Sequence, residues 1–283
     1  MPATFDYCLK NGFLGVGWRV PNFANTKNWS EYQEAAQNHH DSFQGSSYIN
    51  RLVKAGDLVW TRDTLGQYYL AQVTSAWEYW SCQEADEKDI DIANIFRCTI
   101  RPVEIDSVPG KVVASFRARR TIQEVASASA LEYSKYLWNQ LSGASAYQVD
   151  AEICRDIFML LDDKETEDAV FLYLQTQGWL ILPNSRQSDT LAFEYLLVQP
   201  TTGEIAAVQV KTGNSGLDAG WYAQYQHKVF LFQSNEIYGN GSPTNVVRIM
   251  PKDLHDFLRE AQAWLPGNLR KKLQLSEVFG RSS

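Results

Sequence analysis

The stretch DTLAFEYLLVQPTTGEIAAVQVKTG, residues 189–213, decides the fold of the C-terminal half of this 283-residue chain. Its apolar runs at 193–199 and 204–212 predict two strands, and PTTG at 200–203 predicts the tight turn that joins them. Such a hairpin places Glu194 near the start of the first strand. Gln209 and Lys211 stand two positions apart in the second strand, so their side chains project from the same face. We therefore expect a carboxylate, an amide oxygen and an ammonium group at one end of the hairpin.

The segments around the hairpin predict an α/β layer. Helical patterns cover 150–161 and 166–177, and Gly178 follows the second pattern at the position that favours the end of a helix. Residues 179–183 predict a further strand, and 253–264 predict a closing helix. The order of helix, strand, hairpin and helix is typical of an α/β domain.

The predicted cluster suits the chemistry of phosphodiester hydrolysis. Glu194 and Gln209 offer the hard oxygen ligands that Mg²⁺ or Mn²⁺ prefers, and a bound cation polarises the phosphate and lowers the pKa of a bound water. Lys211 stands among apolar strand residues, where an ammonium group is costly unless it is paired or functional. The plainer alternative is a cross-strand ion pair between Glu194 and Lys211 without catalysis.

Residues 150–260 resemble the PD-(D/E)xK nuclease superfamily, in which a helix carries a glutamate, one strand an acidic residue and the next strand (D/E)xK. Glu167 matches the helix glutamate, with Asp168 as a close alternative. Glu194 matches the strand acid, with Asp189 as the runner-up, although SRQSDT suits a loop better. QVK at 209–211 matches the last element, with glutamine in place of the carboxylate.

The QxK variant is similar to the Mrr-type restriction endonucleases. The resemblance implies an α/β nuclease fold with a central mixed sheet. It also implies a metal held by Glu194, Gln209 and Glu167, with Lys211 as a further catalytic residue.

The N-terminal half predicts a small β-barrel with inserted helices. Short runs of β-branched and aromatic residues, broken by Gly, Asp and Pro, predict strands at 13–20, 56–62, 67–80, 94–105 and 111–119. Candidate helices cover 29–38 and 48–54. Alternation along the third strand places Trp77 and Tyr79 on one face and Trp80 on the other.

This half resembles the PUA-like superfamily, most closely its EVE branch. The matching residues are the glycine-rich strand ending in Trp18, GDLVW at 56–60, and YYLAQV at 68–73 leading to Trp77. The resemblance implies a pocket that accepts a flipped, modified base, walled by Trp18, Trp60, Trp77 and Tyr79. The alternative for each single aromatic residue is that it belongs to the barrel core.

The segment SFRARRTI carries Arg117, Arg119 and Arg120 at the end of the last predicted strand. These arginines could grip DNA phosphates beside the pocket. A solvated edge strand would have the same composition, because edge strands favour charge.

The two halves are expected to form an α+β protein of two domains. The spacing of apolar residues predicts a helical segment over 121–141, and SGAS at 142–145 is typical of a hinge. We predict a base-recognition domain over residues 1–125, a helical linker over 126–149 and a nuclease domain over 150–283.

Composition limits the other function classes. The chain is 45% hydrophobic with a net charge of −7, which fits a folded protein and argues against coating nucleic acid by bulk charge. The four cysteines are scattered without zinc spacing. No signal peptide or apolar membrane span is evident, so a cytoplasmic protein without a membrane partner is expected.

Together these features predict a modification-dependent, type IV-like restriction endonuclease that acts on DNA carrying a modified base. Cutting both strands predicts a homodimer, because one site cuts one strand. One alternative is a non-catalytic nucleic-acid-binding protein in which Gln209 marks a lost metal site. The other is a nuclease whose first domain binds RNA or a nucleotide.

Overall fold

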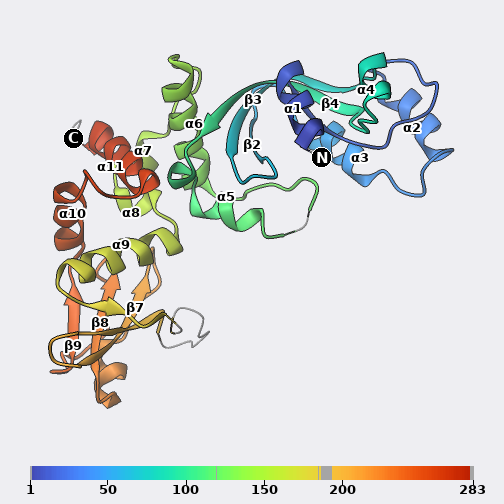
Figure 1. Cartoon of the computed structure of the whole chain (residues 1–283). Helices are drawn as coiled ribbons and strands as arrows, with labels where there is room; N and C mark the ends of the chain where they lie inside the picture. Colours follow the sequence, from blue (N-terminus) through green and yellow to red (C-terminus); the bar gives the residue numbers. More distant parts are fainter. Residues whose placement is uncertain (1, 119, 184, 186–192, 281–283) are drawn as a thin grey trace. The chain divides into compact units, whose positions relative to one another are not determined.

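The computed structural model describes residues 2–118, 120–183, 185 and 193–280 (Figure 1). The chain divides into two compact units, Met1–Ser127 with Ser134–Gln148, and Ala128–Tyr133 with Val149–Ser283. Helix α6 (Ala128–Ser142) therefore contributes residues to both units. Within the described ranges, no helix has the length and apolar character needed to cross a membrane.

The first unit is built on a curled antiparallel sheet in the order β1-β4-β3-β2. Its strands are β1 (Phe13–Val16), β2 (Leu58–Arg62), β3 (Tyr68–Tyr79) and β4 (Asn94–Val103). The register of β3 against β4 shifts between Val73 and Trp77. Such a bulge bends the strand and increases its twist, which contributes to the curl of the sheet.

Helices cover both faces of this sheet. The larger core includes residues of α2 (Trp29–Gln37) and α3 (Gln44–Leu52), and a smaller core includes residues of α1 (Pro2–Asn11) and α4 (Gln83–Glu87). Alternate residues of the strands therefore pack into two different apolar clusters. The helix α1 was not predicted.

The predicted strand at 111–119 is wrong. Residues after the 3-10 turn Ile105–Ser107 form α5 (Gly110–Ser115), and Arg117 lies in the turn that follows it. Pro109 accepts the first backbone hydrogen bonds of this helix, and Val112 is its only buried residue. One buried residue in six does not give the alternation that a half-buried strand needs.

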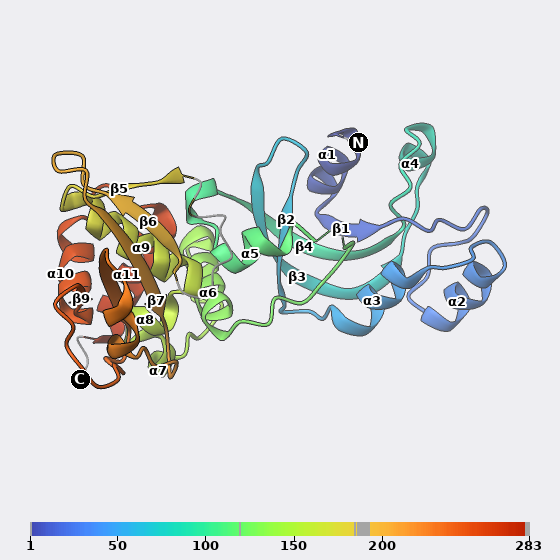
Figure 2. The same ribbon diagram turned by 90° about the horizontal axis from the view of Figure 1, so that it is seen from below.

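The second unit contains a five-stranded mixed sheet in the order β5-β6-β7-β8-β9. Figure 2 shows β5, β6 and β7 of this sheet. Strands β5, β6 and β7 are antiparallel, whereas β7, β8 and β9 are parallel. Their bounds are β5 (Leu180–Ile181), β6 (Tyr195–Val198), β7 (Ile205–Lys211), β8 (Lys228–Gln233) and β9 (Val246–Ile249). The predicted hairpin is β6–β7, and β8 and β9 were not predicted.

Helices cover one face of the mixed sheet. Its main core joins Val208 and Val210 of β7 to residues of α9 (Asp163–Thr176), α10 (Pro251–Glu260) and α11 (Gly267–Gly280). Residues 150–161, predicted as one helix, form α7 (Ala151–Cys154) and α8 (Ile157–Leu160). Asp156 separates them, because its side chain caps the second helix by accepting from the Phe158 N–H.

The opposite face of the sheet is covered by the crossover between β7 and β8. Ala207 of β7 and Leu231 of β8 pack there against the 3-10 segment η3 (Ala219–Gln224). Gln209 follows Ala207 by two positions, so its side chain lies on this same face. The sheet thus presents Gln209 to the crossover and the flanking Val208 and Val210 to the helices.

Candidate functional site

Two of the predicted site residues converge on a carboxylate oxygen of a third. The backbone N–H of Glu194 donates to the Val208 carbonyl at 2.8 Å, which holds Glu194 in the hairpin just before β6. The Gln209 Nε2 donates to the Glu194 Oε1 at 2.7 Å. The Lys211 Nζ lies 3.5 Å from that same oxygen. The hairpin register therefore brings Glu194, Gln209 and Lys211 together.

The cluster runs from the protein interior to the surface. Gln209 is 2% exposed, whereas the side chains of Glu194 and Lys211 are 21% and 40% exposed. A ligand can therefore approach the carboxylate and the ammonium group from solvent. Gln209 forms the buried end of the cluster.

The amide oxygen of Gln209 is buried and has no hydrogen-bond partner among the residues described. Rotating the amide by 180° would bring this oxygen to the position of Nε2, 2.7 Å from the Glu194 Oε1. Two oxygens this close repel each other unless a cation or proton lies between them. Neighbouring ligands of an octahedral Mg²⁺ at about 2.1 Å are about 3.0 Å apart, so the pair fits a shared divalent cation.

Glu167 lies on the second turn of α9 and is buried. Both of its carboxylate oxygens accept from the Lys164 Nζ at 2.8 Å. Burial raises the pKa of Glu167, the Lys164 ammonium opposes this rise, and the negative charge of Glu194 adds to it. Glu167 therefore interacts with Glu194 through charge, while its own backbone carbonyl accepts from the Tyr195 hydroxyl at 3.2 Å.

Two neighbours of the site were missed in the sequence. Lys164 stands three positions before Glu167, a spacing that pairs opposite charges on a helix and could have been recognised. Asp163 accepts from the Thr212 hydroxyl at 2.7 Å and so ties the start of α9 to the residue after Lys211. Nothing in the sequence indicated that second contact, because 49 positions separate its partners.

No group of three or more His, Cys, Asp or Glu residues suited to a metal occurs in the described part of the chain. A cation at this site would therefore depend on the Gln209 amide oxygen beside the two glutamates. Asp168, the alternative to Glu167, is half-buried on α9. Asp189, the alternative to Glu194, lies outside the described residues.

Trp77 and Tyr79 are core residues of the first unit, which corrects their predicted role as pocket walls. The Trp77 Nε1 donates to the Asn94 Oδ1 at 3.1 Å, and the Asn94 amide donates to the Tyr32 hydroxyl at 2.9 Å. The Tyr79 hydroxyl donates to the Val20 carbonyl at 3.0 Å. Their faces are covered because helices α2 and α3 pack on this side of the sheet.

Trp18 and Trp60 are half-buried and keep part of their surface open to solvent. Trp18 has a positive φ of 60°, and its ring lies against Gly45, where an added Cβ would fall 2.3 Å from a ring carbon. Glycine is therefore required at position 45 for this ring placement. The Trp60 Nε1 donates to the Ser134 hydroxyl at 3.0 Å.

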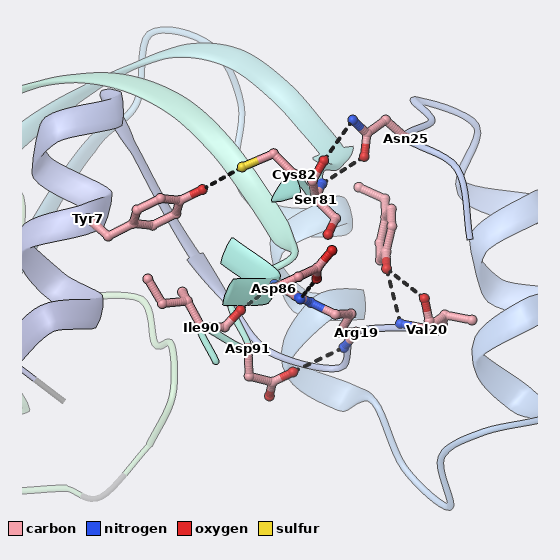
Figure 3. A network of polar contacts seen from close by, with 10 residues as sticks. Tyr7, Arg19, Val20, Asn25, Ser81, Cys82, Asp86, Ile90 and Asp91 are labelled. Atoms are coloured by element: carbon pink, nitrogen blue, oxygen red, sulfur yellow. Dashed lines mark hydrogen bonds and ion pairs between the residues drawn. The ribbon is translucent and has the colours of Figure 1, made fainter. Parts of the chain in front are cut away.

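A polar network holds the segment around Arg19 (Figure 3). The Arg19 guanidinium donates to the Asp86 carboxylate and to the Ile90 carbonyl, and its backbone N–H donates to the Asp91 carboxylate at 3.4 Å. On the other side of this network the Tyr7 hydroxyl lies 3.0 Å from the Cys82 sulfur. The acidic segment after β3 is thereby fixed to the residues next to Trp18.

Two of the predicted phosphate-binding arginines, Arg117 and Arg120, do not lie on a strand. Arg117 and Arg120 are exposed in the turn region after α5. Arg119 lies outside the described residues. Exposure leaves Arg117 and Arg120 accessible to phosphate, but Arg117 does not lie on the strand whose face it was predicted to share with Arg119.

Comparison of the chain with known protein families, with curated proteins and with solved structures finds no match.

Proposed function

We propose that the second unit is a metal-dependent nuclease of the PD-(D/E)xK kind, in the QxK variant. The observation that carries the proposal is the convergence of the Gln209 amide and the Lys211 ammonium on one oxygen of Glu194. The buried amide oxygen without a partner among the described residues adds an unused metal ligand to this group. The mixed sheet with helices on one face is compatible with such a fold.

In the proposed mechanism Glu194 and the Gln209 amide oxygen would hold Mg²⁺ or Mn²⁺, and Glu167 would contribute directly or through water. A cation held there would act as a Lewis acid toward the phosphate and would lower the pKa of a bound water. Lys211, the most exposed member, orients the attacking water and offsets the charge that develops on the phosphate. Gln209 rotates its amide so that the oxygen replaces the nitrogen beside Glu194.

For the first unit we propose a PUA-like, EVE-type reader of modified bases. The curled antiparallel sheet and the partial exposure of Trp18 and Trp60 support this role. Joined to a nuclease, such a reader would direct cutting to DNA that carries the modified base and spare unmodified DNA. A homodimer would supply the second active site for the second strand.

The second candidate is a nucleic-acid-binding protein without catalysis. It is favoured by the closed ion pair of Lys211 with Glu194, which satisfies both charges without a cation. In that case Gln209 is a structural residue that replaced a metal ligand. A third candidate keeps the nuclease but gives the first unit RNA or a nucleotide as its ligand.

Cleavage of DNA containing plain cytosine, methylated cytosine or glucosylated hydroxymethylcytosine tests the proposal. The wild type should cut one modified DNA in Mg²⁺, and Lys211→Ala should not. Lys228→Ala is the matched control, because Lys228 lies on β8 and pairs with Glu204 at 3.0 Å outside the site. Binding of DNA by the wild type without cutting of any substrate would favour the non-catalytic candidate.

Trp18→Ala tests the reader. This variant should cut modified and plain DNA alike while its thermal stability still responds to Mg²⁺. An undiminished preference for modified DNA would remove Trp18 from the base-binding surface. Competition of the cleavage by RNA or free nucleotides separates the third candidate from the first.

A further inference from the structure

Four aromatic rings form a cluster beside the candidate metal site. The cluster, here called the aromatic ledge, consists of Phe193, Trp221, Tyr222 and Tyr225. The Phe193 ring centroid lies 4.8 Å from that of Tyr225 and 5.9 Å from that of Tyr222. The Trp221 centroid lies 4.9 Å from that of Tyr222 and 5.5 Å from that of Tyr225. The four rings thus form one continuous aromatic cluster.

The ledge adjoins the candidate metal site through Phe193 and Tyr222. Phe193 directly precedes Glu194 in the chain. Tyr222 is buried, and burial together with the charges of Tyr225 and Glu194 raises the pKa of Tyr222 to about 12. The Tyr222 ring centroid lies 5.9 Å from that of Phe193, so Tyr222 packs against the residue next to the carboxylate that binds Gln209 and Lys211.

The members of the ledge differ in exposure. Tyr222 is buried and Tyr225 is half-buried, whereas Trp221 is 49% exposed. The backbone of Trp221 is fixed, because its N–H donates to the Asp218 carbonyl at 3.1 Å and its carbonyl accepts from the Gln224 amide at 3.1 Å. A large apolar ring is thus held partly in solvent by an ordered backbone and by two neighbouring rings.

The chemistry beside Glu194 matches the two parts of a nucleotide. Lys211 offers a partly exposed positive charge for a phosphate, and the half-exposed indole of Trp221 offers aromatic surface for a base. Inside a duplex both faces of a base are covered by its neighbours, so an indole can stack only on an unpaired or extruded base. Stacking of this kind tolerates any base, because each base has a π-face.

We propose that Trp221 stacks on an unpaired base of the strand whose phosphate enters the Glu194 site. The inference rests on the proposed nuclease function and specifies its substrate as locally single-stranded DNA. A single-stranded segment or a base extruded next to the modified one meets this requirement.

The test is binding of a fluorescein-labelled 12-nucleotide single strand and of the matching duplex, measured by anisotropy in EDTA. Alanine substitution at a stacked aromatic residue weakens binding by about 5- to 160-fold per base. We expect a loss in this range for Trp221→Ala on the single strand and no change on the duplex. Trp221→Phe should recover part of the affinity, because phenylalanine keeps an aromatic face.

Trp264→Ala is the matched control, because Trp264 belongs to the same unit and is 53% exposed. Equal affinities of Trp221→Ala and wild type for the single strand, or no measurable binding by the wild type, would overturn the proposal. Equal losses in Trp221→Ala and Trp264→Ala would also overturn it.

Cleavage in Mg²⁺ is measured separately with the same proteins. If the wild type cuts DNA but Trp221→Ala keeps full affinity for the single strand, the ledge proposal fails and the nuclease proposal stands. If Trp221→Ala loses affinity but no protein cuts, the nuclease proposal fails and single-strand binding stands.

Discussion

Gln209→Glu places a second carboxylate against Glu194 and tests the role of the Gln209 amide at the site. The substitution replaces the donating Nε2, 2.7 Å from the Glu194 Oε1, with an oxygen. It removes a hydrogen bond to a charged group and brings two negative charges together. Without a divalent cation the second unit should therefore lose stability at pH 7.

The size of this loss can be bounded. Two unit charges about 4 Å apart repel by about 4 kcal/mol at an effective dielectric constant of about 20. Proton uptake limits the loss of stability, because a proton on one carboxyl removes the repulsion. Keeping a carboxyl with an ordinary pKa of about 4.3 protonated at pH 7 costs about 3.7 kcal/mol. The Lys211 ammonium, 3.5 Å from Glu194, reduces the repulsion. We expect a loss of about 2–3 kcal/mol at pH 7.

The pH dependence has a defined sign. The folded protein would hold a proton on the carboxyl pair that the unfolded chain releases, so the pKa of the pair is raised on folding. The stability of Gln209→Glu should fall as pH rises above about 4.3, and most of the loss should be absent at pH 5. Mg²⁺ should reverse the loss at pH 7, by about 2.7 kcal/mol at a concentration 100 times its dissociation constant.

Urea unfolding of the second unit at pH 5 and pH 7, in EDTA and in Mg²⁺, measures these effects. Gln233→Glu is the matched control, because Gln233 is fully buried on β8 and donates to the Gly213 carbonyl at 2.7 Å. It should also lose stability, but without recovery in Mg²⁺. The same Mg²⁺ response in both variants, or no loss in Gln209→Glu at pH 7, would refute the metal-site geometry.

Three further substitutions test the surroundings. Glu167→Gln should stabilise the second unit at pH 7, because burial raises the pKa of Glu167. The variant should also lose less stability than the wild type as pH rises above about 4.3, which urea unfolding across pH measures. Its cleavage of DNA should be lost. Lys272→Met should cost about 3–5 kcal/mol in urea unfolding, because it leaves Glu165 buried without its ion-pair partner, and adding Glu165→Gln should recover most of the loss. Asn94→Ala should lower the stability of the first unit by about 3 kcal/mol in thermal unfolding, because the Trp77 Nε1 and other buried groups lose their partner; a loss below about 1 kcal/mol would contradict this.

The sequence predicted the hairpin and α9 because local signals define them. The tight turn at 200–203 fixes which residues of β6 and β7 face each other, and so brings Gln209 beside Glu194. Asp162 and Glu165 form a capping box at the start of α9, and Gly178 has a positive φ of 84° just beyond its end. Such contacts span few positions, so the order of residues is sufficient to indicate them.

The remaining elements depend on contacts that sequence spacing does not encode. Alternation along β3 assigned Trp77 and Tyr79 to one face, but not whether helices would cover that face. The ion pair of Lys272 with Glu165 joins positions 107 residues apart, and no pattern near either residue indicates it. The packing of Tyr222 against Phe193 likewise depends on how the crossover lies on the sheet.

The anchoring of α9 separates two glutamates that stand two positions apart. Glu165 accepts from the buried Lys272 ammonium and from the Asn268 amide at 3.0 Å, whereas Glu167 lies about 200° further around the helix axis. The buried Glu165–Lys272 ion pair therefore fixes the rotation of α9 about its own axis. A one-residue insertion between the two glutamates would turn Glu167 by about 100° relative to Glu165, so α9 tolerates substitutions there more readily than changes in length.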